Sequence, residues 1–486
     1  MNYSAGVHQR FEVGGTPFVY GASAAAIVAL DGPADAALAH FAQPGGADAS
    51  DWLDDTGERR ETFEELVAMG LLAPVGEVAP TPDALPPAPY PLATVVLNVT
   101  NKCNLSCTYC YEYGEDRISP AAAARAPRMS PEVARQSIDM LFERSSGRGD
   151  VSVTFFGGET LLNFDTIREA VLYAEQRAFE LHRHVSFALT TNATLLTDDT
   201  IAFLAAHDFG INVSIDGAKG DQDRHRVFKS GRGSYDIVVP NIRKLLAAMA
   251  KSRRPVGARV TLTRGMGDVL DTYRHLTGEI GFNHVGFAPV TSASDREWSL
   301  ADGDMGQLLA GFRALAEDYV AAALEDREHG FSNLHDLLTE LHRGVNKAYP
   351  CGAGLGLVGV STDGEIGLCH RFVESGEHAI GDVAHGIDES KRLAFLAKGH
   401  ISQKIACHEC FARPHCSGGC YHEAYVRYRD ASQPNLHYCE WVRAWTRLGL
   451  ESYGRIALGN PAYLARFETR DGLDMRKLAT TVKEPA

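Results

Sequence analysis

The sequence lacks the features that mark several common classes of protein. No stretch approaches 18 uninterrupted apolar residues, so we expect no membrane-spanning helix. The first residues, Met1–His8, contain no basic segment that leads into an apolar run, so we expect no secretory leader. Basic side chains are in the minority, 47 against 62 acidic ones, and the formal net charge of −15 argues against binding to nucleic acids or anionic membranes.

The composition that remains is that of an ordinary globular protein, with 45% apolar and 22% charged residues. The 486 residues are enough for two or three domains, each with its own core. Ten of them are cysteines. In a chain that is not secreted, cysteines indicate metal ligands or catalytic groups more readily than disulfides, so we expect a cytoplasmic location.

Residues 1–73 have the pattern of a small α+β module. Phe11–Tyr20 predicts a β-hairpin that turns at Gly14-Gly15, and helical patterns follow across 35–41 and 62–72. A hairpin followed by helices resembles the peptide-recognition domain that is fused to many peptide-modifying enzymes. A small packing or dimerisation domain is the alternative.

Two irregular stretches interrupt the chain. Pro74–Pro91 contains seven prolines in eighteen residues. Because proline fixes φ and lacks a backbone donor, we expect a linker and a domain boundary there. Ser119–Pro131, a mixture of alanine, proline and arginine, is expected to be a flexible excursion from the domain that follows the linker.

Beyond the linker, strand and helix patterns alternate. The candidate strands are apolar and β-branched, and they cover 94–100, 151–156, 185–190, 211–215, 256–262 and 284–289. The candidate helices lie near 131–144, 163–181, 198–207, 234–250 and 268–278. Six such units predict a parallel α/β sheet with helical crossovers, in a domain placed at 92–300. After it we expect a helical connector at 301–348, a cysteine-rich domain at 349–445, and a C-terminal helix with a tail at 446–486.

A compact cysteine motif follows the first of these strands. Cys103, Cys107 and Cys110 have Cys-x3-Cys-x2-Cys spacing. So short a loop can place three sulfurs on three corners of one iron–sulfur cube and leave the fourth iron open to a small molecule. A zinc knuckle or three unrelated core cysteines are the alternatives, but zinc usually takes four ligands, and the loop contains no histidine.

This spacing resembles the signature of radical S-adenosylmethionine (SAM) enzymes. The resemblance implies a (βα)6 partial TIM barrel, with a [4Fe–4S] cluster on Cys103, Cys107 and Cys110 and SAM at the open iron. In that family the reduced cluster cleaves SAM, and a 5′-deoxyadenosyl radical then takes hydrogen from the substrate. The chemistry gathers at the carboxyl ends of the strands, which is where this loop falls.

The same resemblance assigns SAM contacts to the ends of later strands. Gly157, Gly158 and Glu159, after the second strand, would hold the SAM amino group, and glycine allows the backbone to approach a ligand closely. Asn192, after the third strand, would position the ribose or the carboxylate of SAM. Ala193 stands where the family usually has glycine, which puts the local turn in question.

The fourth strand and the cysteine loop add three further candidates. Ser214 would reach SAM, and Asp216 would face the substrate as a base or an anchor; a helix cap or turn former is the alternative for Asp216. Tyr109 would pack near the adenine, with ordinary core packing as its alternative.

Seven cysteines remain in the C-terminal part of the chain. Their spacing, together with Gly364, resembles the SPASM domain, a twin-cluster extension of radical enzymes that modify peptides and proteins; a zinc ribbon is the alternative. The family's interleaved pattern implies one auxiliary [4Fe–4S] cluster on Cys351, Cys369 and Cys420. It implies a second, fully ligated cluster on Cys407, Cys410, Cys416 and Cys439.

These assignments use every cysteine and leave one corner of the cluster on Cys351, Cys369 and Cys420 without a cysteine. Sulfatase-maturing relatives have an extra cysteine in the interval that here is Gly352–Leu368. We expect an open iron that a substrate thiolate can occupy, with His370, Asp363 or another oxygen or nitrogen donor as the alternative. The fully ligated cluster would relay electrons.

Two segments, Val99–Arg117 and Phe155–Phe164, resemble one branch of this group, the maturation enzymes of quinohemoprotein amine dehydrogenase. The resemblance implies thioether bonds between cysteine sulfurs and Asp or Glu methylene carbons of the dehydrogenase's small γ subunit, with flavodoxin or ferredoxin as reductant. Arg224, Arg226 and Arg259 are candidates to pair with substrate carboxylates, with solvation at the surface as the alternative role for at least two of them. A radical side-chain dehydrogenase of the sulfatase-maturing kind, a maturase for another Cys-rich peptide and a zinc-stabilised binding protein are the alternatives.

Overall fold

The computed structural model describes residues 1–53, 57–76, 90–112, 118, 126–290 and 295–468. Most of the expected linker, the first part of the expected excursion at Ser119–Pro131, and the expected C-terminal tail lie outside the described residues. Among the helices that are described, none combines the length and the apolar character needed to cross a bilayer.

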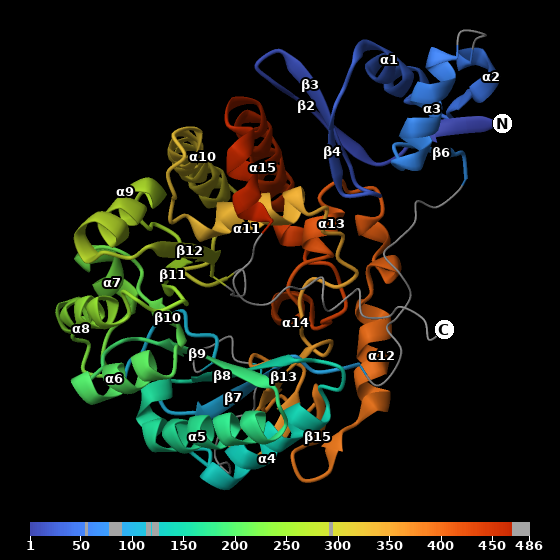
Figure 1. Ribbon diagram of the computed structural model, residues 1–486. Coiled ribbons are helices and arrows are strands. Elements are labelled where there is room, and N and C mark those ends of the chain that lie inside the picture. The colour runs from blue at the N-terminus through green and yellow to red at the C-terminus, as the bar shows by residue number, and fades with distance from the viewer. Residues whose placement is uncertain (54–56, 77–89, 113–117, 119–125, 291–294, 469–486) are drawn as a thin grey trace.

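A ten-stranded sheet forms the centre of the molecule (Figure 1). Six neighbouring parallel strands follow one another in chain order: β7 (Thr94–Thr100), β8 (Asp150–Gly157), β9 (His184–Thr191), β10 (Gly210–Ser214), β11 (Val256–Leu262) and β12 (His284–Pro289). All six predicted strands are confirmed to within two residues at each end. Every residue of β7 is buried, as expected for the central strand of a parallel sheet that is covered on both faces.

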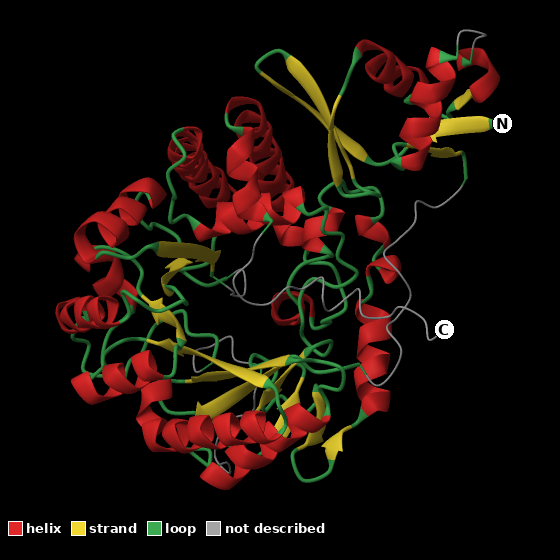
Figure 2. Cartoon of the chain, viewed as in Figure 1, coloured by secondary structure: helices red, strands yellow, loops and turns green. Residues whose placement is uncertain are grey.

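Helices connect these strands and cover the outer, convex side of the curved sheet (Figures 1 and 2). They are α4 (Pro131–Glu143), η1 (Thr160–Asn163), α5 (Phe164–Glu180), α6 (Asp198–Ala206), α7 (Lys219–His225), α8 (Tyr235–Ala248), α9 (Val269–Arg274) and the π-helical turn η2 (His275–Ile280). The α4 helix begins where its sequence directs it to: the Ser130 side chain accepts the Val133 N–H and Pro131 follows as the first helical residue. The sequence analysis missed α7, which is short and polar.

The sheet continues past β7 with strands from the C-terminal part of the chain. They are β13 (Leu357–Val360), β14 (Glu365–Gly367), β15 (Ala379–Asp382) and β16 (Gly386–Ile387). The β13 strand pairs in parallel with β7, and the last three pair antiparallel in succession. The cysteine-rich segment is therefore joined to the barrel by backbone hydrogen bonds.

The rest of the cysteine-rich segment consists of helices and short turns, several of which lie on the concave side of the sheet (Figure 1). These elements are α12 (Glu389–Gly399), η3 (Ile401–Gln403), η4 (Ile405–Cys407), α13 (Arg413–Cys416), α14 (Tyr421–Tyr428) and η5 (Leu436–Tyr438). Three further helices and a 3-10 turn pack beside β12: α10 (Asp302–Leu324), α11 (Ser332–His342), α15 (Cys439–Gly459) and η6 (Pro461–Phe467).

The N-terminal module contains the predicted hairpin and helices. Its elements are β1 (Asn2–Ala5), β2 (His8–Val13), β3 (Thr16–Gly21), β4 (Ala26–Ala29), α1 (Gly32–Phe41), β5 (Ala47–Asp48), α2 (Ala49–Trp52), α3 (Glu58–Ala68) and β6 (Leu72–Pro74). Alternation along β3 divides its side chains between two cores. Val19 joins a small core within the module, while Tyr20 joins the main core and bonds His415 at 2.9 Å.

Candidate functional site

The cysteine loop leaves the carboxyl end of β7 at the centre of the sheet. Cys103, Cys107 and Cys110 are all free thiols. The loop is anchored to the segment after α7, because Ser106 donates its backbone N–H to the Val227 carbonyl at 2.8 Å. The structure therefore brings the three predicted ligands together at the carboxyl edge of the parallel strands.

The electrostatics of these thiols reflect their proximity. Burial raises the pKa of Cys103 to about 11, and the neighbouring Glu159 and Cys110 contribute to the rise. Burial also raises the pKa of Cys107 to about 11; Cys103 adds to the shift, while the Arg226 guanidinium opposes it. Thiolates, not thiols, bind metal, so at neutral pH a metal centre must displace the protons here. Three free and mutually close cysteines are the donor set that an iron–sulfur cluster takes.

A close contact between backbone segments requires glycine at positions 157 and 158, where β8 ends. A Cβ atom on Gly157, whose φ is +139°, would lie 2.3 Å from the Thr100 carbonyl oxygen, and one on Gly158 would lie 2.2 Å from that of Lys102. Only glycine allows this contact. Glu159 then donates its backbone N–H to Lys102 O at 2.9 Å. Gly157 and Gly158 therefore allow the end of the second strand to pack directly against the start of the cysteine loop.

Glu159 is almost fully buried and already bound by the third strand. Its carboxylate accepts the Thr191 hydroxyl at 2.6 Å and the Asn192 backbone N–H at 2.8 Å. The Asn192 side-chain nitrogen lies 3.8 Å from Cys103 Sγ, so this turn adjoins the cysteine loop. Ala193 has a φ of +62°, the left-handed conformation that favours glycine, so the turn forms in spite of its alanine.

Asp216 is held in a buried network. It is 3% exposed, accepts the Tyr109 hydroxyl and the Thr261 backbone N–H (3.0 Å), and forms an ion pair with Arg226 Nε at 3.0 Å. Arg226 also lies over the Tyr109 ring, 5.4 Å from its centroid. The sequence indicated neither partner of Asp216, because no local pattern connects these positions. Ser214, at the end of β10, is half-buried beside them.

A second group of cysteines forms from three distant segments. Cys351 follows α11, Cys369 follows β14, and Cys420 precedes α14. Burial raises the pKa of Cys369 to about 12, and Cys351 and Cys420 add to the rise, which places the three thiols close to one another. The structure brings together the three residues that the sequence grouped.

Tyr111 lies between this second group and the cysteine loop. Burial raises its pKa, and both Cys110 and Cys369 add to the shift, so the ring is near a thiol of each group. The Arg371 guanidinium stacks over the same ring at 4.3 Å. No motif in the sequence pointed to this contact between the two halves of the chain.

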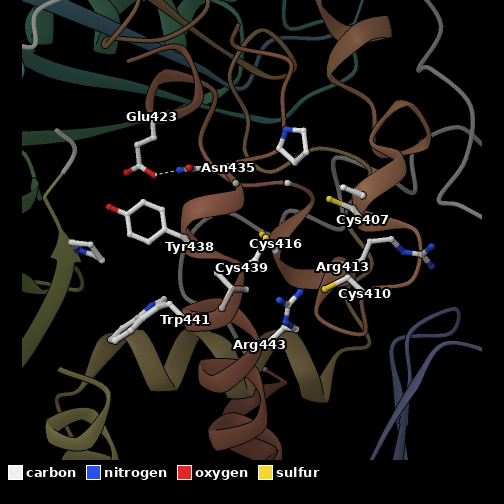
Figure 3. Close-up of a pocket in the computed structure, with 16 residues that line it drawn as sticks. Cys407, Cys410, Arg413, Cys416, Glu423, Asn435, Tyr438, Cys439, Trp441 and Arg443 are labelled. Atoms are coloured by element: carbon white, nitrogen blue, oxygen red, sulfur yellow. Dashed lines mark hydrogen bonds between the residues drawn. The ribbon is translucent and has the colours of Figure 1, made fainter. Parts of the chain in front are cut away.

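The third group lines a pocket of about 210 Å³ in the C-terminal part (Figure 3). Its cysteines are Cys407, Cys410, Cys416 and Cys439. Burial raises the pKa of Cys407 to about 11, with contributions from the other three thiols. Four free thiols around one pocket are the donor set of a fully ligated cluster.

None of the described His, Cys, Asp and Glu side chains forms a group of three or more that could hold one metal ion. A tetrahedral zinc would bring its sulfurs to about 3.8 Å from one another. The cysteine sulfurs around a cube of four irons lie further apart than those around one zinc ion. This finding therefore applies to sites for a single metal ion and not to iron–sulfur clusters.

The two suggested fourth ligands of the second group have other contacts. The His370 ring packs against Phe156 with centroids 4.5 Å apart, and burial, together with Arg371, lowers its pKa to about 3. Asp363 accepts a hydrogen bond from the Ser361 hydroxyl in the turn between β13 and β14. Because the His370 ring stays neutral, it keeps a lone pair that can bind metal.

Residues 97–273 match the family model of the Radical SAM superfamily. This part of the chain is similar to radical SAM domains. Such domains use a [4Fe–4S] cluster and SAM, and the free cysteines at the end of β7 fit that cluster.

Known proteins with similar sequences cover different shares of the chain. It is 24% identical over 348 residues to a serine-type anaerobic sulfatase-maturating enzyme of Klebsiella aerogenes, covering 69% of this chain and 81% of that protein. A protein of the same description from Bacteroides thetaiotaomicron is 26% identical over 383 residues, with 72% and 88% covered. An uncharacterised protein of Methanocaldococcus jannaschii is 31% identical over 140 residues, which are 29% of this chain and 44% of that protein.

The fold is similar to that of a solved structure, anSMEcpe with bound AdoMet. The TM-score is 0.61 at 19% sequence identity, covering 80% of this chain and 97% of that one. The similarity extends well beyond residues 97–273, and it concerns the fold alone.

Proposed function

We propose that this chain is a radical SAM enzyme that modifies side chains of a protein or peptide substrate, with the expected cytoplasmic location. The grouping of all ten cysteines into three sites carries the proposal, because a barrel enzyme with one cluster needs only the first site. Two similar proteins are described as sulfatase-maturating enzymes, and one solved structure of anSMEcpe contains a bound peptide, Kp18Cys.

In this proposal the cluster that cleaves SAM is held by Cys103, Cys107 and Cys110. Cys351, Cys369 and Cys420 hold a second cluster, and Cys407, Cys410, Cys416 and Cys439 hold a third. Residues 349–445 would then form a SPASM domain, with residues 1–73 as the peptide-recognition module. When bound, SAM and its cluster supply a radical that takes hydrogen from a substrate carbon.

The surrounding residues would orient SAM and the substrate. Gly157, Gly158 and Glu159 fix the cysteine loop and border the SAM amino group, while Asn192, Ser214 and Tyr109 line the rest of the cofactor. Asp216 is buried in its ion pair with Arg226. A base would need that pair to open, so of the two roles expected for Asp216 we assign that of an anchor for the substrate.

The specific reaction that we propose is thioether formation between a cysteine sulfur and an Asp or Glu methylene carbon. One C–H and one S–H bond break and one C–S bond forms. The hydrogen atom would go to the radical derived from SAM, the proton to solvent, and the electron to the auxiliary clusters of the C-terminal half. The second group has only three cysteines, which leaves room for the substrate thiol. By resemblance, the substrate would be the γ subunit of quinohemoprotein amine dehydrogenase and the reductant a flavodoxin or ferredoxin.

The second candidate is oxidation of a Cys or Ser side chain to an aldehyde, which the description of the sulfatase-maturating relatives favours. Both reactions remove two hydrogens from the substrate, and for a Cys substrate the aldehyde also requires water, which replaces the sulfur and releases hydrogen sulfide. A thioether consumes an alkylatable thiol and gives no reaction with hydrazide, whereas an aldehyde reacts with hydrazide.

The test is to incubate the reconstituted enzyme with SAM, dithionite and a candidate Cys-rich substrate, then to measure mass, thiol content and hydrazide reactivity. A loss of two mass units with loss of one thiol, and no hydrazide adduct, supports cross-linking. A hydrazide adduct supports the second candidate and overturns the first.

A further inference from the structure

The three arginines that the sequence analysis offered as partners of substrate carboxylates have different contacts in the structure. Arg224 donates to the Gly265 carbonyl at 2.6 Å and to the Thr263 hydroxyl at 2.9 Å, so it fixes the turn after β11. Arg226 is buried in its ion pair with Asp216. Both guanidinium groups serve the protein itself.

Arg259 is different. It lies in the middle of β11, where the alternating Val256, Ala258, Val260 and Leu262 are buried in the main core, so Arg259 projects from the opposite, concave face of the sheet. Its side chain is exposed there, and no residue that the structure describes forms a hydrogen bond or ion pair with its guanidinium.

The surroundings of Arg259 come from both halves of the molecule. The surrounding protein lowers its pKa by desolvation, and Arg371 lowers it further, while Tyr111, Asp336 and Glu423 act in the opposite direction. Tyr111 borders the cysteine loop, and Arg371 and Glu423 flank the second cysteine group. Arg259 is thus near residues that adjoin both the cysteine loop and the second cysteine group.

The guanidinium of Arg259 lies close to the backbone of the neighbouring strand. In the neighbouring β12 strand the residue opposite Arg259 is Gly286, and a Cβ added there would lie 3.5 Å from Arg259 Nη1 and 3.0 Å from Ser332 Oγ. A guanidinium offers a planar set of donors that matches a carboxylate in a bidentate pair.

We propose that Arg259 binds a carboxylate, namely the side-chain carboxylate of the Asp or Glu whose carbon is modified. This inference rests on the proposed function and names the residue that selects acidic side chains. The carboxylate of SAM is the other group that Arg259 could bind in the same way. The neighbours Arg371 and Glu423 belong to the C-terminal half and favour the substrate. The register partner of Arg259 on β10 is Ser214, a residue assigned to SAM, so the test measures SAM affinity separately.

The test compares Arg259→Gln and Arg259→Lys with the wild type and with Arg253→Gln, an exposed arginine before the same strand. The probes are two fluorescent peptides with one cysteine each, identical except for Asp in one and Asn in the other. Affinity for each peptide is measured by anisotropy, and affinity for SAM by equilibrium dialysis, on the reconstituted enzyme without dithionite. Circular dichroism reports folding.

We expect the wild type and Arg253→Gln to bind the Asp peptide about 10- to 100-fold more tightly than the Asn peptide. Arg259→Gln should remove this preference and Arg259→Lys should keep part of it, with SAM affinity unchanged in both. Equal binding of the two peptides to the wild type, or a preference that survives in Arg259→Gln, would overturn the proposal.

If Arg259→Gln loses affinity for SAM and keeps the peptide preference, Arg259 binds SAM, and the proposal is overturned. Binding does not require cross-linking. An enzyme that shows the Arg259-dependent preference but forms no thioether leaves this inference standing and refutes the proposed reaction.

Discussion

The barrel and the C-terminal half hold their cysteines in different ways. In the barrel, three cysteines lie within the eight residues of Cys103–Cys110, directly after a fully buried parallel strand. In the C-terminal half, seven cysteines are spread over Cys351–Cys439, among strands of two to four residues and short helical turns. The first site follows a long buried strand, and the other two are formed by short turns and helix ends, such as Cys439 at the start of α15.

This difference indicates how each half depends on its metal. The barrel has an apolar core of buried strands and helices and needs no cluster to fold. The C-terminal half shares this core through residues such as Val358 and Phe372, but its cysteines lie mostly on short turns, and we expect metal binding to stabilise those turns. We therefore expect loss of the first cluster to remove activity and loss of the others to loosen structure.

The largest effect is expected from Cys103→Ala. Because the loop loses one of its three ligands, SAM cleavage should be abolished and iron should fall by about four atoms per chain. The far-ultraviolet circular dichroism should stay that of the wild type. SAM cleavage that survives this change, measured as 5′-deoxyadenosine after dithionite addition, would show that the cysteine loop does not hold the catalytic cluster.

Cys407→Ala tests the other half. It should also lose about four irons, but here we expect limited proteolysis to cut within 349–445, because the emptied pocket no longer holds its loops together. Cys103→Ala is the matched control and should resist the same protease. Equal resistance of the two variants would contradict the contrast between the halves.

Sequence reasoning succeeded where the pattern is local. The six parallel strands and their main helices follow from apolar runs and caps such as Ser130. It failed for contacts between distant segments: the pairing of β13 with β7, the buried pair of Asp216 with Arg226, and the place of Tyr111 between two cysteine groups. Register and ion pairing over such separations depend on tertiary packing, which no short pattern encodes.

Arg392 holds α12 against the segments around Gly354 and Tyr90 and gives the next effect. This arginine on α12 is 1% exposed, donates to the carbonyls of Gly354 (2.7 Å) and Tyr90 (2.9 Å), and pairs with Glu389 at 3.1 Å. Arg392→Ala should lower the free energy of unfolding by about 3 kcal/mol, since the buried carbonyls lose their donor.

Chemical denaturation of the anaerobically purified enzyme measures this effect. The exposed neighbour Lys391 is the control, because Lys391→Ala should change the free energy of unfolding by less than about 0.5 kcal/mol. Similar values for the two variants would mean that the buried contacts of Arg392 do not stabilise the protein.

The smallest effect concerns the turn beside the cysteine loop. Because Ala193 adopts a φ of +62°, Ala193→Gly should stabilise the barrel by about 1 kcal/mol. Ala205→Gly, inside helix α6, should destabilise it by about 1 kcal/mol. If both variants shift the denaturation midpoint in the same direction, the turn does not carry the expected strain.

Metal analysis of the wild-type protein, purified without oxygen and reconstituted with iron and sulfide, tests the central claim that three cysteine groups hold three clusters. Quantification of iron, acid-labile sulfide and zinc should give about 12 irons and as many sulfides per chain, with no zinc. A value of about four irons would leave only the barrel cluster, and a preparation that contains zinc without iron would contradict the claim entirely.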